Sequence, residues 1–344
     1  MRLGFSLSPG GLLFPYHLGV LTALQRRGYV TDQTPLAGSS AGAIAVASHG
    51  AKVDPMDALS GCIRISEHCL KSEDGRARGK LMKLLEKELD EMLPPDAHHI
   101  VNSRTGMIGL AWKEIFPLPT KNVLATKFDN REDFIEAVVN SSMFPFFTSN
   151  MPFVVRKGTP INDLLSNNNH SNNRIDLPST STQELEVAYS DFLSNKSMRE
   201  DDVTDLLSGR SAIIRKFNVP KITLPRLVVD GFFTVPRDRF GCPRFPEISG
   251  VEREILVSPF PHATVGLTAS EPHNQIGPRV EEGEDSMSLL QKLFHAAVNP
   301  SSAAEHKQMF ERGYRDAFRW SDEEDRRRAE VNDFFMSNLQ TSPF

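Results

Sequence analysis

The spacing of hydrophobic and polar positions predicts alternating strands and helices in the first part of the chain. Residues 2–7 form an apolar run that indicates a short buried strand, and the turn residues at 8–11 end it. Leucines then recur at helical spacing over residues 15–27, which predicts a helix. A second short strand is expected to end near Ala37, before a tight turn and a helix that ends around Gly50.

The same reasoning predicts further elements toward the C-terminus. Residues 79–96 make a strongly amphipathic helix that two consecutive prolines stop. The other expected elements are a helix at 131–140 capped by Asn130, strands at 224–231 and 252–260, and a helical tail at 286–340. Within the tail, the charged stretch 321–330 starts with the Ser321/Glu324 pattern of a capping box, and we predict that it is a solvated helix face.

Residues 157–221 interrupt this pattern with a polar segment. The segment is rich in Asn, Ser, Asp and Thr and has no sustained apolar period, so we predict an insertion that is largely disordered. The alternating strands and helices around it predict a three-layer α/β/α fold with a mainly parallel central sheet. We expect one domain at residues 1–320 that contains the insertion, and a charged helical C-terminal tail at residues 321–344.

Composition and charge narrow the classes of function. The chain has 344 residues and a formal net charge of −5, and its Lys and Arg residues are not clustered with aromatic residues, so a nucleic-acid interface is not expected. Three cysteines cannot form a fully paired disulfide framework, which favours a reducing, cytoplasmic compartment. The opening residues lack the pattern of a signal peptide, and no run of about 18 apolar residues predicts a transmembrane helix.

The turn at residues 38–42 is the strongest candidate for chemistry. Its sequence, Gly-Ser-Ser-Ala-Gly, fits the Gly-x-Ser-x-Gly pattern, in which a serine sits on a sharp strand-to-helix turn. Gly38 and Gly42 leave room for a strained backbone, and the N-terminus of the following helix favours developing negative charge. We therefore predict that Ser40 is the nucleophile of an acyl-transfer reaction.

An acyl-transfer site also needs hydrogen-bond donors for the oxyanion that develops on the substrate. The glycine loop after the first strand and the turn at 38–42 should both project from the carboxyl ends of neighbouring parallel strands. We therefore predict an oxyanion hole built from the backbone N–H groups of Gly10, Gly11, Leu12 and Ala41. An ordinary glycine turn is the alternative interpretation of the loop.

The residues alone leave more than one candidate base for Ser40. Asp230 follows an apolar strand, where burial would raise its pKa, and it could take the serine proton directly in a two-residue dyad. Asp230-Gly231 could equally be a turn at the end of a strand, and we hold these two interpretations level. His262 or His273 could instead complete a Ser-Asp-His triad, but the elbow comes too early in the chain for the usual α/β-hydrolase order.

These motifs together resemble the patatin-like phospholipase family. The elbow is similar to the family's nucleophile motif, Pro-Gly-Gly at 9–11 to its oxyanion segment, and Val-Asp-Gly at 229–231 to its Asp-Gly motif. Four further stretches look like the adipose triglyceride lipase branch of the family, namely residues 93–99, 141–149, 255–260 and 310–320.

The resemblance implies a serine hydrolase that cleaves the carboxylic esters of acylglycerols, as a triacylglycerol lipase does, or of phospholipids. It implies Ser40 as nucleophile and Asp230 as base, with no cofactor and no metal. It also implies peripheral association with a membrane or lipid-droplet surface, and it leaves a protein co-activator open. The adjacent histidines His98 and His99 do not change this expectation, because neighbouring residues rarely bind one metal ion.

A catalytically silent protein that binds lipid surfaces is the alternative within the same family. Phe14 stands where the branch usually has glycine, and Phe232 stands where the family usually has glycine or alanine. The Phe232 ring could narrow the pocket or displace the neighbouring Asp230, which would leave lipid binding without turnover.

Overall fold

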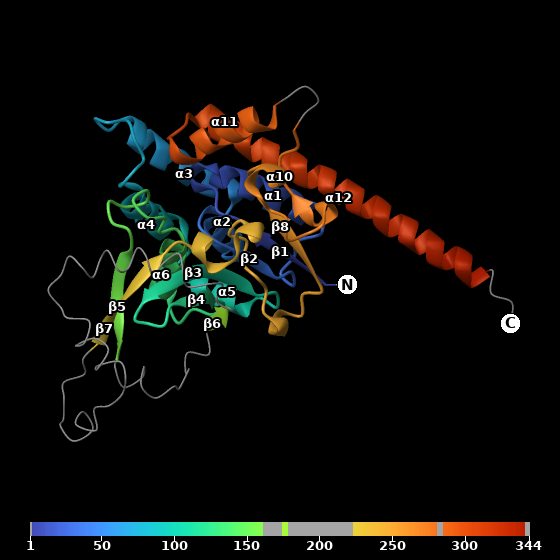
Figure 1. The fold of residues 1–344 in the computed structure, drawn as a ribbon, viewed down its shortest axis with the longest axis horizontal. Helices are drawn as coiled ribbons and strands as arrows, with labels where there is room; N and C mark the ends of the chain where they lie inside the picture. Colours follow the sequence, from blue (N-terminus) through green and yellow to red (C-terminus); the bar gives the residue numbers. More distant parts are fainter. Residues whose placement is uncertain (1, 161–173, 178–222, 281–284, 341–344) are drawn as a thin grey trace, which may run out of the picture.

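The computed structural model describes residues 2–160, 174–177, 223–280 and 285–340, and these residues form a mixed sheet with helices packed around it (Figure 1). The strands are β1 (Leu3–Leu7), β2 (Leu36–Gly38), β3 (Ile108–Phe116), β4 (Lys121–Ala125), β5 (Val154–Pro160), β6 (Arg174–Leu177), β7 (Thr223–Val229), β8 (Arg253–Val257) and β9 (Gln275–Ile276). The α-helices are α1 (Phe14–Arg26), α2 (Ala41–Gly50), α3 (Pro55–Leu70), α4 (Leu81–Met92), α5 (Ala97–Ser103), α6 (Arg131–Ser141), α10 (His262–Val265), α11 (Ser286–Val298) and α12 (Ala303–Gln340). Short 3-10 turns are η1 (Gly11–Leu13), η2 (Gly231–Thr234), η3 (Arg237–Arg239), η4 (Glu247–Ser249) and η5 (Pro272–Asn274).

The centre of the sheet is parallel and its flank is antiparallel. The strand order is β5-β7-β3-β2-β1-β8-β9, and β4 and β6 extend from β3. The pairs β3–β2, β2–β1, β1–β8 and β8–β9 are parallel, whereas β4, β5, β6 and β7 pair antiparallel. The predicted α/β class with a mainly parallel central sheet is therefore confirmed. Because β1 and β2 run parallel, the loops that follow them emerge at the same edge of the sheet.

The two faces of the sheet carry side chains of different size. In β1, Leu3, Phe5 and Leu7 point into the main core that the helices cover. On the other face the residues are small, and the chain after β7 comes close: Ser6 donates a hydrogen bond to the Pro243 carbonyl, and a Cβ at Gly4 would lie 2.7 Å from Val251. Small residues leave room for closely packed 3-10 turns, so η2 to η4 cover much of this face in place of long helices.

Several predicted elements have the expected positions. The helix at 15–27 is α1, and the amphipathic helix predicted at 79–96 is α4, which ends before the two prolines. The helix expected at 131–140 is α6, and the Asn130 side chain accepts a hydrogen bond from the Asp133 N–H at 2.8 Å, as a capping residue should. The predicted strands at 224–231 and 252–260 are β7 and β8.

The predicted polar insertion falls mostly outside the described residues. Within 157–221, the structure describes the end of β5 and the short strand β6. The predicted boundary at residue 320 falls inside α12, and the division into a domain and a tail stays a prediction. Among the described residues, no helix combines the length and the hydropathy that crossing a membrane would need.

The long helix α12 crosses α1 and then continues past the body of the molecule (Figure 1). The two helix backbones touch where both have glycine, because a Cβ at Gly19 would lie 2.0 Å from the Phe310 carbonyl oxygen and one at Gly313 would lie 2.0 Å from that of Tyr16. The Tyr16 hydroxyl donates to Asp316 at 2.9 Å, which adds a buried polar contact to this crossing.

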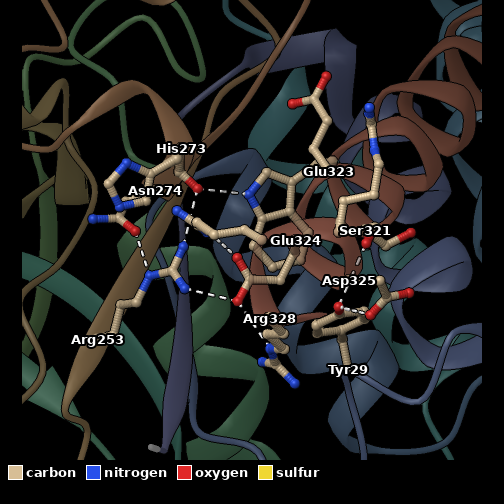
Figure 2. Close-up of polar contacts among 12 residues, drawn as sticks. Tyr29, Arg253, His273, Asn274, Ser321, Glu323, Glu324, Asp325 and Arg328 are labelled. Atoms are coloured by element: carbon tan, nitrogen blue, oxygen red, sulfur yellow. Dashed lines mark hydrogen bonds and ion pairs between the residues drawn. The ribbon is translucent and has the colours of Figure 1, made fainter. Parts of the chain in front are cut away.

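The predicted solvated face at residues 321–330 is wrong in part. α12 begins at Ala303, so Ser321 is not a capping residue, and its hydroxyl donates to the Phe318 carbonyl within the helix. Glu324 is only 1% exposed and pairs with Arg253 of β8 at 2.8 Å and with Arg328 at 3.0 Å (Figure 2). The carboxylate is buried because an arginine from a distant strand meets it, which the local charge pattern does not reveal.

Replacing Glu324 with glutamine should lower the free energy of unfolding by about 3 kcal/mol, since the change leaves buried arginine charge without its partner. Urea denaturation followed by circular dichroism would measure the loss. The neighbouring Glu323 pairs with Arg279 at the surface, so Glu323→Gln should change stability by no more than about 0.5 kcal/mol. Equal effects of the two variants would contradict the importance of the buried cluster.

Candidate active site

Ser40 sits on a strained turn between β2 and α2. Its φ is 53° and its ψ is −123°, a conformation that residues with a side chain rarely adopt. The Ser40 N–H donates to the carbonyl oxygen of Ser141 at 3.1 Å and to its hydroxyl at 3.0 Å, which holds the turn in place. The side chain is 8% exposed and lines a cavity, so the hydroxyl can meet a bound molecule.

The glycines on either side of this turn are required by close contact. A Cβ at Gly38 would lie 2.4 Å from the Gly42 carbonyl carbon, and a Cβ at Gly42 would lie 2.5 Å from the Leu7 carbonyl oxygen. Backbone atoms fill both directions, so neither glycine can gain a methyl group without moving β1 or α2. The helix N-terminus is thereby pressed onto the end of β1.

Gly42→Ala should therefore lower the free energy of unfolding by about 3 kcal/mol, because the new methyl group meets rigid backbone. Gly28→Ala is a matched control: Gly28 has a positive φ, of 76°, but nothing lies within 4 Å of its Cβ position. The control should cost about 1 kcal/mol through backbone strain alone. Thermal unfolding of both variants would measure the difference, and similar melting temperatures would contradict the crowded turn.

Asp230 lies directly after β7 and is held against the same turn. Its N–H donates to the Met143 carbonyl at 2.9 Å, two residues from the Ser141 that anchors Ser40. The following Gly231 has no space for a side chain, because a Cβ there would lie 2.5 Å from the Ser39 Cβ and 2.3 Å from the Ala111 carbonyl oxygen. The Asp-Gly pair thus touches the serine turn through residues that are distant in sequence.

The two carboxylate oxygens of Asp230 have different surroundings. Oδ1 accepts a hydrogen bond from the Phe232 N–H at 2.8 Å, so the residue also caps η2 as a turn-forming aspartate would. Oδ2 is buried without a hydrogen-bond partner among the described residues. One oxygen therefore holds the turn, and the other is available for a further hydrogen bond.

Burial raises the pKa of the Asp230 carboxyl to about 7. The Phe232 N–H and, to a lesser extent, the Ser40 side chain lower this pKa, so the Ser40 hydroxyl lies close enough to interact with the carboxyl. No hydrogen bond of ordinary length and angle joins the two side chains, and catalytic contacts often tighten only when substrate binds. A base with a pKa near 7 can be ionised at neutral pH and still accept a proton.

The structure places the predicted oxyanion residues around Ser40. Gly10, Gly11, Leu12 and Ala41 all line the cavity that Ser40 lines. A Cβ at Gly10 would lie 3.6 Å from the Ala41 Cβ, so the glycine loop and the start of α2 are neighbours. Gly11 has a φ of 55°, and a Cβ there would meet the Ala297 carbonyl oxygen at 2.3 Å, so glycine is needed at this position.

The cavity in front of Ser40 is apolar and has a volume of about 330 Å³. Its walls come from the glycine loop, α2, α3, α4, the segment 142–148 and α11. The apolar face predicted for residues 79–96 forms part of the wall through Leu81, Leu85 and Leu89. Of the described lining residues, Glu88 alone has a charged side chain, and Arg64 pairs with it at 2.6 Å.

Phe14 and Phe232, which depart from the family pattern, both line this cavity. Phe232 packs edge to face against Phe240 at 5.7 Å, while Asp230 remains buried behind the serine turn. The rings therefore shape the cavity wall and do not move Asp230 out to solvent.

The histidines that could have completed a triad lie elsewhere. Neither His262 nor His273 lines the cavity, and neither influences the pKa of Asp230. One ring nitrogen of His262 bonds to the Ile276 carbonyl oxygen at 3.1 Å, and the His273 carbonyl accepts from Trp320. The described residues therefore bring Ser40 together with Asp230 and not with either histidine.

Comparisons with known proteins agree with this arrangement in the first half of the chain. Residues 5–169 match the family model for patatin-like phospholipases. This part of the chain is similar to patatin-like phospholipases. The matched region contains the glycine loop and Ser40 but ends before Asp230, so the match does not bear on Asp230.

Two similar proteins extend the comparison. The human patatin-like phospholipase domain-containing protein 5 is 30% identical over 172 residues, which cover 48% of this chain and 39% of the relative, so the match spans less than half of that relative's length. The crystal structure of VipD from Legionella pneumophila is 15% identical and covers 94% of this chain and 67% of the other, with a TM-score of 0.34. The more specific resemblance to the adipose triglyceride lipase branch stays a prediction.

Sequence reasoning singled out residues 141–149 as a family-like stretch but missed that its first residues join the two halves of the candidate site. Residues 141–143 bind both the serine turn and the Asp230 backbone, and the Ser141 hydroxyl also donates to the Ala111 carbonyl at 2.6 Å. A pair of serines at the end of a helix gives no local sign of this role. This role depends on topology, because residues 141–143 reach Asp230 only when β7 pairs beside β3.

Proposed function

We propose that this protein is a serine lipid acyl hydrolase in which Ser40 and Asp230 act as a catalytic dyad. The observation that carries the proposal is the meeting of a strained serine with a buried, partly unsatisfied carboxylate beside an apolar cavity. The patatin-like match supports lipid ester hydrolysis as the class of reaction. The dyad and the preferred lipid go beyond that match.

The proposed reaction begins with attack of the Ser40 Oγ on the ester carbonyl carbon while Asp230 Oδ2 takes the serine proton. Backbone N–H groups of Gly10, Gly11, Leu12 and Ala41 stabilise the negative oxygen of the tetrahedral intermediate. Asp230 then gives the proton to the leaving alcohol, and the acyl group stays on Ser40. Water attacks this acyl-enzyme by the same route in reverse, which releases a fatty acid and restores the dyad.

The wall of the cavity supports a long apolar acyl group as the substrate part that binds there. Ile44, Ile65 and Leu85 offer only hydrocarbon to a bound chain, whereas the ester must remain near Ser40 and the N–H groups at the other side. We therefore infer that acylglycerols or phospholipids are the substrates. Because such lipids are held in membranes or droplets, we propose a cytoplasmic protein that associates with these surfaces peripherally, with or without a protein co-activator.

The release of fatty acid from lipids by the wild-type protein tests this proposal. The protein would be incubated with a soluble p-nitrophenyl ester, with phosphatidylcholine vesicles and with a trioleoylglycerol emulsion, and fatty acid and nitrophenol would be measured. We expect hydrolysis of the soluble ester and of at least one lipid, together with covalent labelling of Ser40 by a fluorophosphonate probe. Absence of both hydrolysis and labelling in a folded protein would contradict the proposal.

The silent lipid-binding protein is the second candidate, and the two phenylalanine rings in the cavity favour it. It predicts association with the lipid emulsion but no reaction of Ser40 with the probe. Phe232→Ala offers a direct comparison, because it widens the cavity beside Asp230. If this variant alone were labelled, the natural protein would be the silent binder; equal labelling of both would exclude that role.

A further inference from the structure

The geometry points to a defined docking face for anionic phospholipid surfaces at the mouth of the cavity, with the ring of Phe146 as its inserting side chain. This inference deepens the proposed function, on which it rests for the identity of the lipid substrate. We call the face the mouth patch and define it by Phe144, Phe146, Met151 and Phe294.

The mouth of the cavity is located by residues that both line it and are exposed to solvent. Phe144 is 40% exposed and Phe294 is 60% exposed, and both line the cavity. They come from different parts of the chain, Phe144 from the segment after α6 and Phe294 from α11. A lipid chain that reaches Ser40 from outside therefore passes between aromatic rings.

The position of the Phe146 ring is not explained by packing inside the protein. It is 51% exposed, does not line the cavity and has a φ of 58°, a left-handed conformation that favours glycine or asparagine. Residues held in such conformations at a cost tend to be found at functional sites. The backbone thus holds a large apolar ring out into solvent, beside the mouth.

The turn that carries Phe146 is fixed by hydrogen bonds to its neighbours. The Phe146 N–H donates to the Met151 carbonyl at 3.2 Å, and its carbonyl oxygen accepts from the Arg78 guanidinium at 2.9 Å. The next carbonyl, of Phe147, accepts from the Gly79 N–H at 2.7 Å. A rigid turn of this kind presents the ring without a further ordering cost on binding.

Positive charge lies in the connection between α3 and α4, which is bonded to the Phe146 turn through Arg78. Arg76 and Arg78 are exposed and form no ion pair with any residue in the described ranges, while in the same connection between α3 and α4 Lys80 pairs with Asp74. Glu73 is the remaining exposed acid there, so this connection has a positive balance. Cationic side chains next to an aromatic ring suit the anionic headgroups and acyl boundary of a phospholipid surface.

An apolar residue at the opposite end of the sheet provides the control. Ile248 is 88% exposed and lies in η4, close to the start of β1, where the Glu252 N–H donates to the Arg2 carbonyl. The serine turn follows the other end of the parallel strands. Arg244, which is also exposed, serves in the same way as a control for the cationic residues.

Vesicle flotation of the full chain tests the docking face. Ser40→Ala serves as the background so that no lipid is consumed, and phosphatidylcholine vesicles are used with and without phosphatidylserine. Phe146→Gly should keep the fold, since glycine suits the positive φ. It should lower vesicle binding about tenfold, because the ring that inserts into the lipid surface is lost. Arg76→Gln should lower binding about fivefold on phosphatidylserine vesicles only, and added salt should have the same effect on the parent protein.

The controls separate this inference from the proposed function. Ile248→Ser and Arg244→Gln should bind like the parent, and Phe146→Gly with Ser40 intact should hydrolyse a soluble p-nitrophenyl ester at the wild-type rate. Unchanged vesicle binding by Phe146→Gly, or an equal loss in Ile248→Ser, would overturn the docking face. A wild-type protein that binds vesicles through Phe146 but hydrolyses no ester would refute the proposed function and leave the docking face standing.

Discussion

Replacing Ser40 with alanine should lower kcat/KM for ester hydrolysis by about 10⁵-fold, to the level of background catalysis, while the fold stays intact. The hydroxyl is the nucleophile of the proposed reaction, and no other described hydroxyl or thiol lies both on the strained turn and beside the buried carboxylate. The Ser40 hydroxyl makes no hydrogen bond of ordinary length and angle with Asp230, so its removal should leave the melting temperature close to that of the wild type.

The adjacent serine is the matched control for this loss. The Ser39 hydroxyl donates to the Gly241 carbonyl oxygen in the interior and does not line the cavity. Ser39→Ala should keep most of the activity and cost about 1 kcal/mol of stability. If Ser40→Ala retained the activity of the wild type, Ser40 would have no part in the reaction, and another group would have to supply the nucleophile.

Replacing Asp230 with asparagine should have opposite effects on activity and on stability. Activity should fall at least about 10³-fold, because the amide cannot accept the serine proton, although it keeps nearly the same shape. The amide oxygen of the variant would still accept the hydrogen bond from the Phe232 N–H that now reaches Oδ1 of Asp230. The loss should therefore come from chemistry and not from collapse of the turn.

The effect on stability follows from the raised pKa. The Asp230 pKa is about 7 in the folded protein and 3.8 in the reference state, so the folded state binds the proton more tightly. The protonated Asp230 carboxyl favours folding. Its contribution to the free energy of unfolding is lost as pH rises through about 7, because the buried carboxyl must then become charged. Asp230→Asn removes that cost and should raise the free energy of unfolding by up to about 4 kcal/mol above pH 7, with little change below about pH 4.

Urea denaturation across this pH range would measure the stability of both proteins. Asp238→Asn serves as a control, because Asp238 is exposed to solvent. A stability gain that is the same at acidic and alkaline pH would show that the Asp230 carboxyl is not titrating between them. A variant that retains full activity would remove Asp230 from the mechanism even if the stability effect appeared.

The part of the fold that local patterns determine could be predicted from the sequence. α1, α4 and α6 have a clear helical period, and the glycines around Ser40 mark the turn that the structure contains. The order of strand, helix, strand and helix placed the glycine loop and Ser40 at one edge of a parallel sheet. This topological argument brought the predicted oxyanion residues to the same cavity as Ser40.

The elements that the sequence did not reveal depend on contacts made over long distances. β3 and β4 form an antiparallel hairpin whose strands are stabilised by pairing with neighbours, and α5 was not among the helices predicted from the sequence. Glu324 is buried because Arg253 meets it, although the two lie far apart in the sequence. Such contacts depend on which segments the fold brings together, and hydropathy along the chain does not contain that information.

The sequence was enough to name the candidate residues, whose roles stay predictions, but not the contacts that hold them in place. Asp230 could be read as a base or as a turn residue, and the structure gives it both surroundings, with one oxygen in the turn and the other unpartnered among the described residues. The anchoring of both halves by residues 141–143 and the exposed ring of Phe146 could not be predicted from the sequence, because the family-like stretch 141–149 does not show which atoms it contacts or which ring faces solvent. The patatin-like match likewise supports the serine half of the site only.

The central claim is that Asp230 accepts the proton of Ser40, and the pH dependence of Ser40 labelling tests it most directly. The rate of reaction with a fluorophosphonate probe would be followed by mass spectrometry between about pH 5 and pH 9, in the wild type and in Asp230→Asn. The account predicts that the wild-type rate rises about tenfold per pH unit and levels off above about 7, and that this step is absent in the variant. A wild-type rate that does not change with pH, or a step that survives in Asp230→Asn, would contradict it.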